Sequence, residues 1–252
     1  MFTVDEPNLS LAWSKTLVKA YDTPGNEISP LVVNIQNNAD SVLEMPSIRS
    51  ALDTALKNCG HQSVQTVANT IFPSSLWRIS NGDRRVLFSL YQKNIPRYRK
   101  LAPNLNNRGL YFERLIAFGR GPINGNQLEF ILDLYKSRKG VIRKKFQASV
   151  FDPERDHDRA ARTIFPCLQH VSFSPDRERS ELSMNAFYAT QTLFQKGYGN
   201  CLGLWRLGEF MADQMGLRLR NLTCFVGVEM LGTTKTKVAD LVEAVRPFTI
   251  QK

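Results

Sequence analysis

The chain has 252 residues, of which 42% are hydrophobic, and 33 Lys and Arg against 23 Asp and Glu give it a net charge of +10. This size and composition fit one domain over residues 1–252 and exclude a chain that is disordered throughout. No apolar run reaches the roughly 18 residues of a membrane span, and the N-terminus has no apolar signal segment, so we expect a cytoplasmic protein with no membrane partner. The positive charge favours anionic partners, such as phosphorylated small molecules.

The helical spacing of apolar residues dominates the first half of the chain. It predicts, in order, a helix over Ser10–Tyr21, a buried strand over Leu31–Ile35 and a helix over Ile48–Leu56. A helix around Val86–Tyr91 should end near Pro96, because proline cannot donate the backbone hydrogen bond of a helix interior. The stretch Asn104–Gly109 has the composition of a turn.

The second half shifts toward the period of two that strands show. A helix over Leu128–Tyr135 and the basic stretch Lys136–Lys145 come first. The pattern then predicts strands over Gln147–Phe151, Cys167–Phe173, Leu182–Tyr188 and Leu222–Val228. A helix over Asn200–Met215, with Gly216 as its terminator, separates the last two strands. This mixture indicates an α+β domain with a large sheet.

The cysteines are spread along the chain as Cys59, Cys167, Cys201 and Cys224. The absence of a CxxC pair excludes a zinc ribbon and a thioredoxin-like motif, and the sequence predicts no metal site. No stretch interleaves arginines with aromatic residues as nucleic-acid-binding motifs do, so the sequence does not favour a nucleic-acid partner.

Cys167 is the candidate nucleophile. It follows a proline at the mouth of a predicted strand, and a cysteine attacks as its thiolate, which nearby positive charge stabilises. The preceding loop carries Arg155, Arg159 and Arg162, and His170 follows three residues later. The alternative is a structural cysteine, since cysteines are among the most buried residues of proteins.

The segments around Cys167 follow one another in an order known from one protein family. PCLQHVSF, LSMNAFY, KGYGN and NCLGLWRLGEFMADQMGL occur in that order, preceded by RGLY, NQLEFIL and RKKFQASVFDP. Over about residues 105–230 this series resembles thymidylate synthase and the related pyrimidine hydroxymethylases. The resemblance implies an α+β fold with a large mixed sheet packed with helices, and a homodimer that pairs through the sheet.

The resemblance also implies roles for individual residues. Cys167 would add to C6 of a pyrimidine, Asn200 would hydrogen-bond its N3–H and O4, and Tyr111 would assist proton removal from C5. The family's proton-relaying Glu has no clear counterpart, with Asn69 at its nearest equivalent and Glu113 as a possible substitute. From the residues alone, Asn200 could equally be a helix N-cap and Tyr111 a core aromatic residue.

Phosphate binding is where the sequence departs from the family. Thr190 and Gln191 stand where the family has Arg-Ser. The partner subunit's contribution would fall on two adjacent residues among Arg143, Lys144 and Lys145, although such a basic run is also typical of a solvated turn. Gln169 and His170, which follow Cys167, complete the candidate substrate-binding set.

We therefore expect one-carbon transfer, as methyl or hydroxymethyl, to C5 of a uracil-type nucleotide or nucleoside. By the resemblance, the donor would be 5,10-methylenetetrahydrofolate. The lost family residues motivate an alternative, a catalytically degenerate protein of the same fold that binds or senses a nucleotide.

Overall fold

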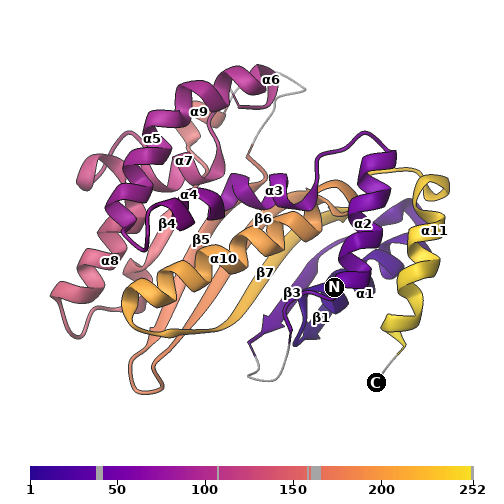
Figure 1. The fold of residues 1–252 in the computed structure, drawn as a ribbon. Coiled ribbons are helices and arrows are strands. Elements are labelled where there is room, and N and C mark those ends of the chain that lie inside the picture. Colours follow the sequence, from indigo (N-terminus) through magenta and orange to yellow (C-terminus); the bar gives the residue numbers. More distant parts are fainter. Residues whose placement is uncertain (38–41, 107, 158, 160–165, 251–252) are drawn as a thin grey trace.

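The computed structural model describes residues 1–252 except 38–41, 107, 158, 160–165 and 251–252. Within the described residues the strands form one seven-stranded mixed sheet with helices packed against it, which confirms the predicted α+β class (Figure 1). The strand order is β1-β3-β7-β6-β5-β4, and β2 pairs separately with β7. None of the helices described is both long and apolar enough to cross a membrane.

The strands differ in length, and the long ones form the centre of the sheet. Their bounds are β1 Phe2–Glu6, β2 Glu27–Ile28, β3 Leu31–Gln36, β4 Gln147–Ser149, β5 Leu168–Asp176, β6 Glu181–Thr192 and β7 Arg218–Met230. The pairs β1–β3 and β6–β7 are parallel, and the other neighbours are antiparallel. The sheet therefore joins the two ends of the sequence, since β7 lies between β3 and β6.

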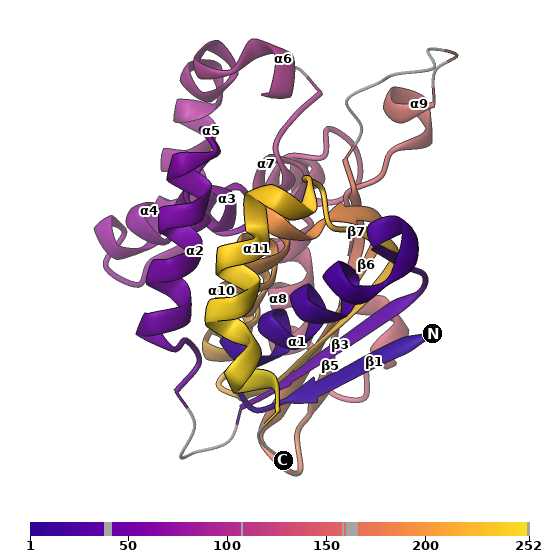
Figure 2. The ribbon, with the colours of Figure 1, turned by 90° about the vertical axis from the view of Figure 1, so that its right-hand side faces the viewer.

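The longer helices gather on one side of the sheet (Figures 1 and 2). The α-helices are α1 Leu9–Asp22, α2 Pro46–Asn58, α3 Val64–Ile71, α4 Ser74–Ile79, α5 Arg84–Leu101, α6 Pro103–Asn106, α7 Tyr111–Ile116, α8 Gln127–Ser137, α9 Pro153–Asp156, α10 Tyr198–Met215 and α11 Lys235–Val245. Short helical turns lie at Pro24–Asn26, Ile123–Gly125, Arg143–Lys145, Leu193–Gly197 and Arg246–Thr249.

Helix α10 lies across β6 and β7 and carries α3 on its outer side. Two glycines allow this close approach. A Cβ atom on Gly199 would lie 2.6 Å from the Cβ of Val67, and one on Gly203 would lie 2.7 Å from the carbonyl oxygen of Ala68. Helix α10 ends, as predicted, at Gly216, which adopts the left-handed conformation with φ of 70°.

The two faces of the sheet differ in what covers them. In β6 and β7 buried residues such as Tyr188 and Val226 alternate with exposed ones, as expected for strands with one covered face. Cross-strand pairing puts His170, Phe187, Phe225 and Val32 in one row on the side away from α10. Phe187 and Phe225 are 41% and 37% exposed, and their rings stack at 5.5 Å. We call the side of the sheet that carries this row the open face.

Several predicted boundaries were wrong. Helix α5 continues to Leu101 with Pro96 inside it, because the turn beyond the proline is held by packing, with Tyr98 against Tyr91 at 5.3 Å between ring centres. Strand β4 stops at Ser149, because the next two backbone N–H groups both donate to the carbonyl of Gln169. The turn prediction at Asn104–Gly109 overlaps the one-turn helix α6, and its residue 107 lies outside the described residues.

Candidate active site

The three residues singled out for chemistry lie around one cavity of about 720 Å³. Tyr111 begins α7, Cys167 immediately precedes β5, and Asn200 is the third residue of α10. The remaining wall comes from α3, α4, the C-terminal part of α5 and the end of β6. The sheet end and α10 thus bring together residues that are far apart in the sequence.

Cys167 is half-buried at the point where β5 begins. Its carbonyl oxygen accepts a hydrogen bond from the N–H of Ala189 at 3.2 Å, and the Thr190 hydroxyl lies 3.9 Å from its Sγ and donates toward it. A donor at this position stabilises a thiolate. The side chain of Cys167 faces the cavity, so the reading of Cys167 as a buried structural residue does not fit its position.

Gln169 supports the cysteine and does not line the cavity. Its side-chain Nε2 donates to the carbonyl oxygen of Pro166 at 2.8 Å, and the pairing of β5 with β6 shifts register between Leu168 and His170. Such irregularities redirect the chain beside many active sites. The shift lies next to Cys167, whose carbonyl oxygen is still hydrogen-bonded to β6.

Tyr111 is in direct contact with the cysteine segment. The backbone at Leu168 and Cys167 lies close enough to its hydroxyl to lower the pKa of the phenol, against the larger effect of burial. Burial raises the pKa of the Tyr111 phenol well above its ordinary value, so the hydroxyl is neutral at physiological pH. A neutral phenol can pass or hold a proton by hydrogen bonding, but it does not act as a strong base.

Asn200 does not cap its helix, so the N-cap reading was wrong: α10 begins two residues earlier, at Tyr198. Its side chain is buried, and Nδ2 donates to Oε1 of Gln191 at 2.7 Å. Gln191 in turn donates through Nε2 to Oε2 of Glu229 at 3.0 Å. Glu229 is fully buried on β7, and burial raises the pKa of its carboxyl group to about 8.

The cavity wall is positively charged. Among the described lining residues, Arg108 and Lys196 are the cations and no carboxylate is present. Burial lowers the pKa of the Lys196 ammonium, and the charge of Cys167 opposes that shift. The two cations leave the cavity suited to an anionic ligand.

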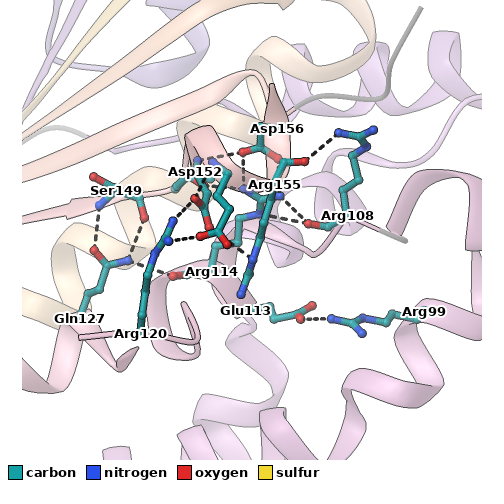
Figure 3. A network of polar contacts seen from close by, with 12 residues as sticks. Arg99, Arg108, Glu113, Arg114, Arg120, Gln127, Ser149, Asp152, Arg155 and Asp156 are labelled. Atoms are coloured by element: carbon teal, nitrogen blue, oxygen red, sulfur yellow. Dashed lines mark hydrogen bonds and ion pairs between the residues drawn. The ribbon is translucent and has the colours of Figure 1, made fainter. Parts of the chain in front are cut away.

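Glu113, the substitute candidate for the family's proton-relaying Glu, does not line this cavity. Its carboxylate pairs with Arg99 and accepts from the backbone N–H of Leu110 at 3.3 Å (Figure 3). In this position it fixes the start of α7, and so the backbone of Tyr111. Asn69, the nearest equivalent in the sequence, does line the cavity.

A buried ion pair ties the Tyr111 segment to the segment that leads to Cys167 (Figure 3). Both terminal nitrogens of the Arg114 guanidinium donate to the carboxylate of Asp156, Nη2 to Oδ1 at 2.7 Å. The side chain of Arg114 is 2% exposed and that of Asp156 is 0% exposed. Arg114 also donates to the carbonyl oxygens of Arg108 and Val150. The pair therefore connects α7 with α9 and with the strand end before it.

The other predicted site residues lie away from the cavity of this chain. His170 is on the open face, and burial lowers the pKa of its imidazole. Arg143, Lys144 and Lys145 form an exposed turn, and Lys145 borders a second, basic hollow with Arg138. Arg162, one of the loop arginines considered beside Cys167, lies outside the described residues.

Sequence reasoning missed three polar residues of the site. The sequence marked Gln191 only as the replacement of the family's serine, and it gave no role to Lys196 or Glu229. Glu229 had a usable signal, because it is a single acidic residue in an otherwise uncharged run of β7, Leu222–Met230. Lys196 lies in a loop whose path depends on the turn between β6 and α10, which local pattern does not fix.

The sequence was compared with known proteins. A scan against protein-family models finds no match, and a search of curated proteins finds no similar sequence.

Proposed function

We propose that this protein transfers a one-carbon unit to C5 of a uracil-type nucleotide or nucleoside, with Cys167 as the nucleophile that attacks C6. The observation that carries the proposal is the meeting of Cys167, Tyr111 and Asn200 around one electropositive cavity. The likeness to thymidylate synthase supplies the reaction, and the cavity supplies a place for it.

The chemistry needs a thiolate beside an electron-poor ring carbon. Addition of the Cys167 sulfur to C6 moves the C5–C6 π electrons onto C5 and O4, which makes C5 nucleophilic. The Thr190 hydroxyl donates toward the sulfur of Cys167, and Lys196 brings a positive charge to the same cavity. C5 then attacks a one-carbon electrophile and loses its proton, and the carrier of the one-carbon unit departs. Hydride, giving methyl, or water, giving hydroxymethyl, adds to the exocyclic carbon, and elimination of the thiolate breaks the C–S bond and returns the cysteine.

Asn200 and Tyr111 complete the chemistry from two sides. The Asn200 amide presents an acceptor for N3–H and a donor for O4, where negative charge develops. Tyr111 keeps a neutral hydroxyl against the backbone of Cys167, where it can carry the C5 proton toward solvent.

The cavity also has room for a second, flat ligand. Apolar and aromatic residues, which we call the aromatic arm, form part of the cavity wall: Leu76, Tyr91, Tyr98, Leu101 and Leu110. Such a surface fits the heteroaromatic ring of a folate, and these side chains would hold it. When bound, methylenetetrahydrofolate would supply the one-carbon unit.

The open face of the sheet is proposed as the contact with a second copy of the chain. Its centre is the exposed, stacked pair Phe187 and Phe225, and the positions around it, such as Asn185, Ser172 and Thr223, are uncharged. An apolar centre with an uncharged polar surround suits a self-complementary interface. The turn Arg143–Lys145 would then be free to reach the partner's cavity with its basic residues.

Release of tritium tests the reaction. Uracil nucleosides and nucleoside monophosphates labelled at C5 are incubated with the protein and methylenetetrahydrofolate, and tritium in water is counted. The wild type and Cys59→Ala should release label, since Cys59 lies outside the cavity, and Cys167→Ala should release none. Equal release by Cys167→Ala would refute the proposal.

A second candidate is a protein that binds a pyrimidine nucleotide without turnover. The observation that favours it is that Thr190 and Gln191 stand where the family has Arg-Ser. Among the described residues, the cavity then has Arg108 and Lys196 as its cations. Tight, reversible binding of a uracil nucleotide without any tritium release would select this function.

A further inference from the structure

The buried chain of hydrogen bonds behind the cavity has a direction. Asn200 donates to Gln191, and Gln191 donates to Glu229. Gln191 and Glu229 are direct cross-strand neighbours on β6 and β7, and all three side chains are at most 5% exposed. Solvent therefore has little part in setting how these amides are oriented.

An ionised Glu229 fixes that direction. A carboxylate only accepts, so Gln191 must turn its Nε2 toward it and its Oε1 toward Asn200. Asn200 must then use one N–H for Gln191. Its Oδ1 makes no hydrogen bond within the described residues, so this oxygen and the second N–H remain for a ligand in the cavity.

A protonated Glu229 allows the opposite direction. The carboxylic acid can donate to Oε1 of a turned Gln191, whose Nε2 then donates to Oδ1 of a turned Asn200. This reversal exchanges the oxygen and the nitrogen that Asn200 shows to the cavity. The first arrangement complements N3–H and O4 of uracil, and the reversed one complements N3 and the exocyclic amine of cytosine.

We infer that Gln191 and Glu229 are positioning residues that set the orientation of the Asn200 amide, so that the charge of Glu229 decides whether the site accepts a uracil or a cytosine edge. This inference rests on the proposed function, because it assumes a pyrimidine beside Cys167. Neither residue need touch the reacting atoms, and Glu229 does not line the cavity.

The surroundings of Glu229 place its titration within an accessible range. Its Oε1 is buried with no hydrogen-bond partner among the described residues, and burial raises the pKa of the carboxyl group to about 8. Cys201 on α10 and Cys224 on β7 face it as neutral thiols, since burial raises the pKa of both. Tyr188 on β6 is a neutral phenol for the same reason, since burial raises its pKa.

The other charged groups on the packed elements do not offset this burial. Lys196, beside Gly197 in the turn before α10, interacts with Cys167, and no cation contributes to the pKa of Glu229. On β2, Ile28 pairs with Glu229 and the neighbouring Glu27 is exposed. Among the described residues, Gln191 is the hydrogen-bond partner that favours the ionised form.

Binding of the two rings tests the inference. Affinities for uracil and cytosine nucleoside monophosphates are measured by calorimetry on both sides of about pH 8. For the wild type, the ratio of the affinity for uracil to that for cytosine should increase by about tenfold or more as Glu229 ionises. The reason is that a fixed Asn200 amide leaves buried polar groups mispaired when cytosine binds. Glu229→Gln keeps the shape but can donate or accept, so its preference should be weak and independent of pH. Glu209→Gln, on α10 outside the cavity, should behave as the wild type.

A second variant tests the same chain of hydrogen bonds in case Glu229→Gln does not fold. A second measurement, made without ligand, separates the role of Glu229 from the proposed function. Gln191→Met, which breaks the chain at nearly constant volume, should also lose the pH-dependent preference. Without any ligand, the side-chain N–H₂ signals of Asn200, assigned by their loss in Asn200→Asp, should shift with a midpoint near pH 8 in the wild type and not in Glu229→Gln.

The outcomes are distinct. An unchanged, pH-dependent preference in Glu229→Gln, or Asn200 signals that ignore pH in the wild type, overturns the inference. A wild type that binds neither ring refutes the proposed function instead, and the Asn200 signals still decide whether Glu229 orients the amide.

Discussion

Tyr111 lies beside Cys167 in the wall of the cavity, close enough for the charge of Cys167 to contribute to the raised pKa of the Tyr111 phenol. This contact joins the start of α7 to the start of β5.

Tyr111→Phe removes the hydroxyl group and keeps the ring. We expect the free energy of unfolding to change by no more than about 1.5 kcal/mol, the usual net contribution of one polar group. The rate of tritium release should fall by about tenfold or more, as for loss of a proton-transferring group. Urea unfolding and the release assay measure the two effects. Tyr21→Phe, outside the cavity, serves as control, and a Tyr111→Phe enzyme of full activity would argue against the role.

Arg114→Met leaves Asp156 as a buried charge without its partner. We expect a loss of about 3–5 kcal/mol of stability, the usual cost of breaking a buried ion pair from one side. Arg246→Met breaks the exposed pair with Asp22 and should change stability little. Comparable unfolding midpoints for the two variants would contradict the anchoring function of Arg114.

Much of this architecture could be predicted from the sequence, because periodicity and terminators act locally. Helix α10 and its end at Gly216 follow from apolar spacing and one glycine. The prediction at Pro96 failed because contacts made by Tyr98 outweigh the local cost of the proline. Strand β1, which the sequence pattern did not reveal, is a short edge strand defined by its pairing with β3.

The candidate site was predictable only in part, for a similar reason. Cys167, Tyr111 and Asn200 could be chosen because each has a chemical role in a known reaction. Glu229 could not be assigned, since its importance comes from lying opposite Gln191 across two strands. The positions of Asn69 and of the aromatic arm depend on how α3 and α5 pack, which no local pattern encodes.

The buried carboxyl of Glu229 should make stability depend on pH. Its folded pKa of about 8 exceeds the ordinary value of 4.5, so the folded state binds the proton more tightly and this group's contribution declines as pH rises between the two values. Glu229→Gln removes the decline. The difference in unfolding free energy, variant minus wild type, should rise with pH by up to about 1.4 kcal/mol per unit and level off above about pH 8. A constant difference in urea unfolding across this range would show that Glu229 is not buried as described.

A charged side chain introduced on the open face should prevent self-association. The wild type is expected to be a dimer by light scattering, and Phe225→Lys a monomer, because a buried unpaired ammonium opposes pairing. Val86→Lys, an equally exposed apolar position on α5, should remain a dimer. A monomeric wild type would remove the role proposed for Arg143, Lys144 and Lys145 in a partner's cavity.

The central claim, attack by Cys167 on a pyrimidine ring, is tested most directly by intact-mass measurement with a stable substrate analogue. The protein is incubated with methylenetetrahydrofolate and 5-fluorouracil nucleosides and nucleotides, since fluorine at C5 cannot leave as a proton does and the covalent complex persists. We predict a mass gain for the wild type and for Cys59→Ala, located by peptide mapping at Cys167 and absent from Cys167→Ala. A gain that persists in Cys167→Ala, or no gain with an analogue that binds, would contradict the account.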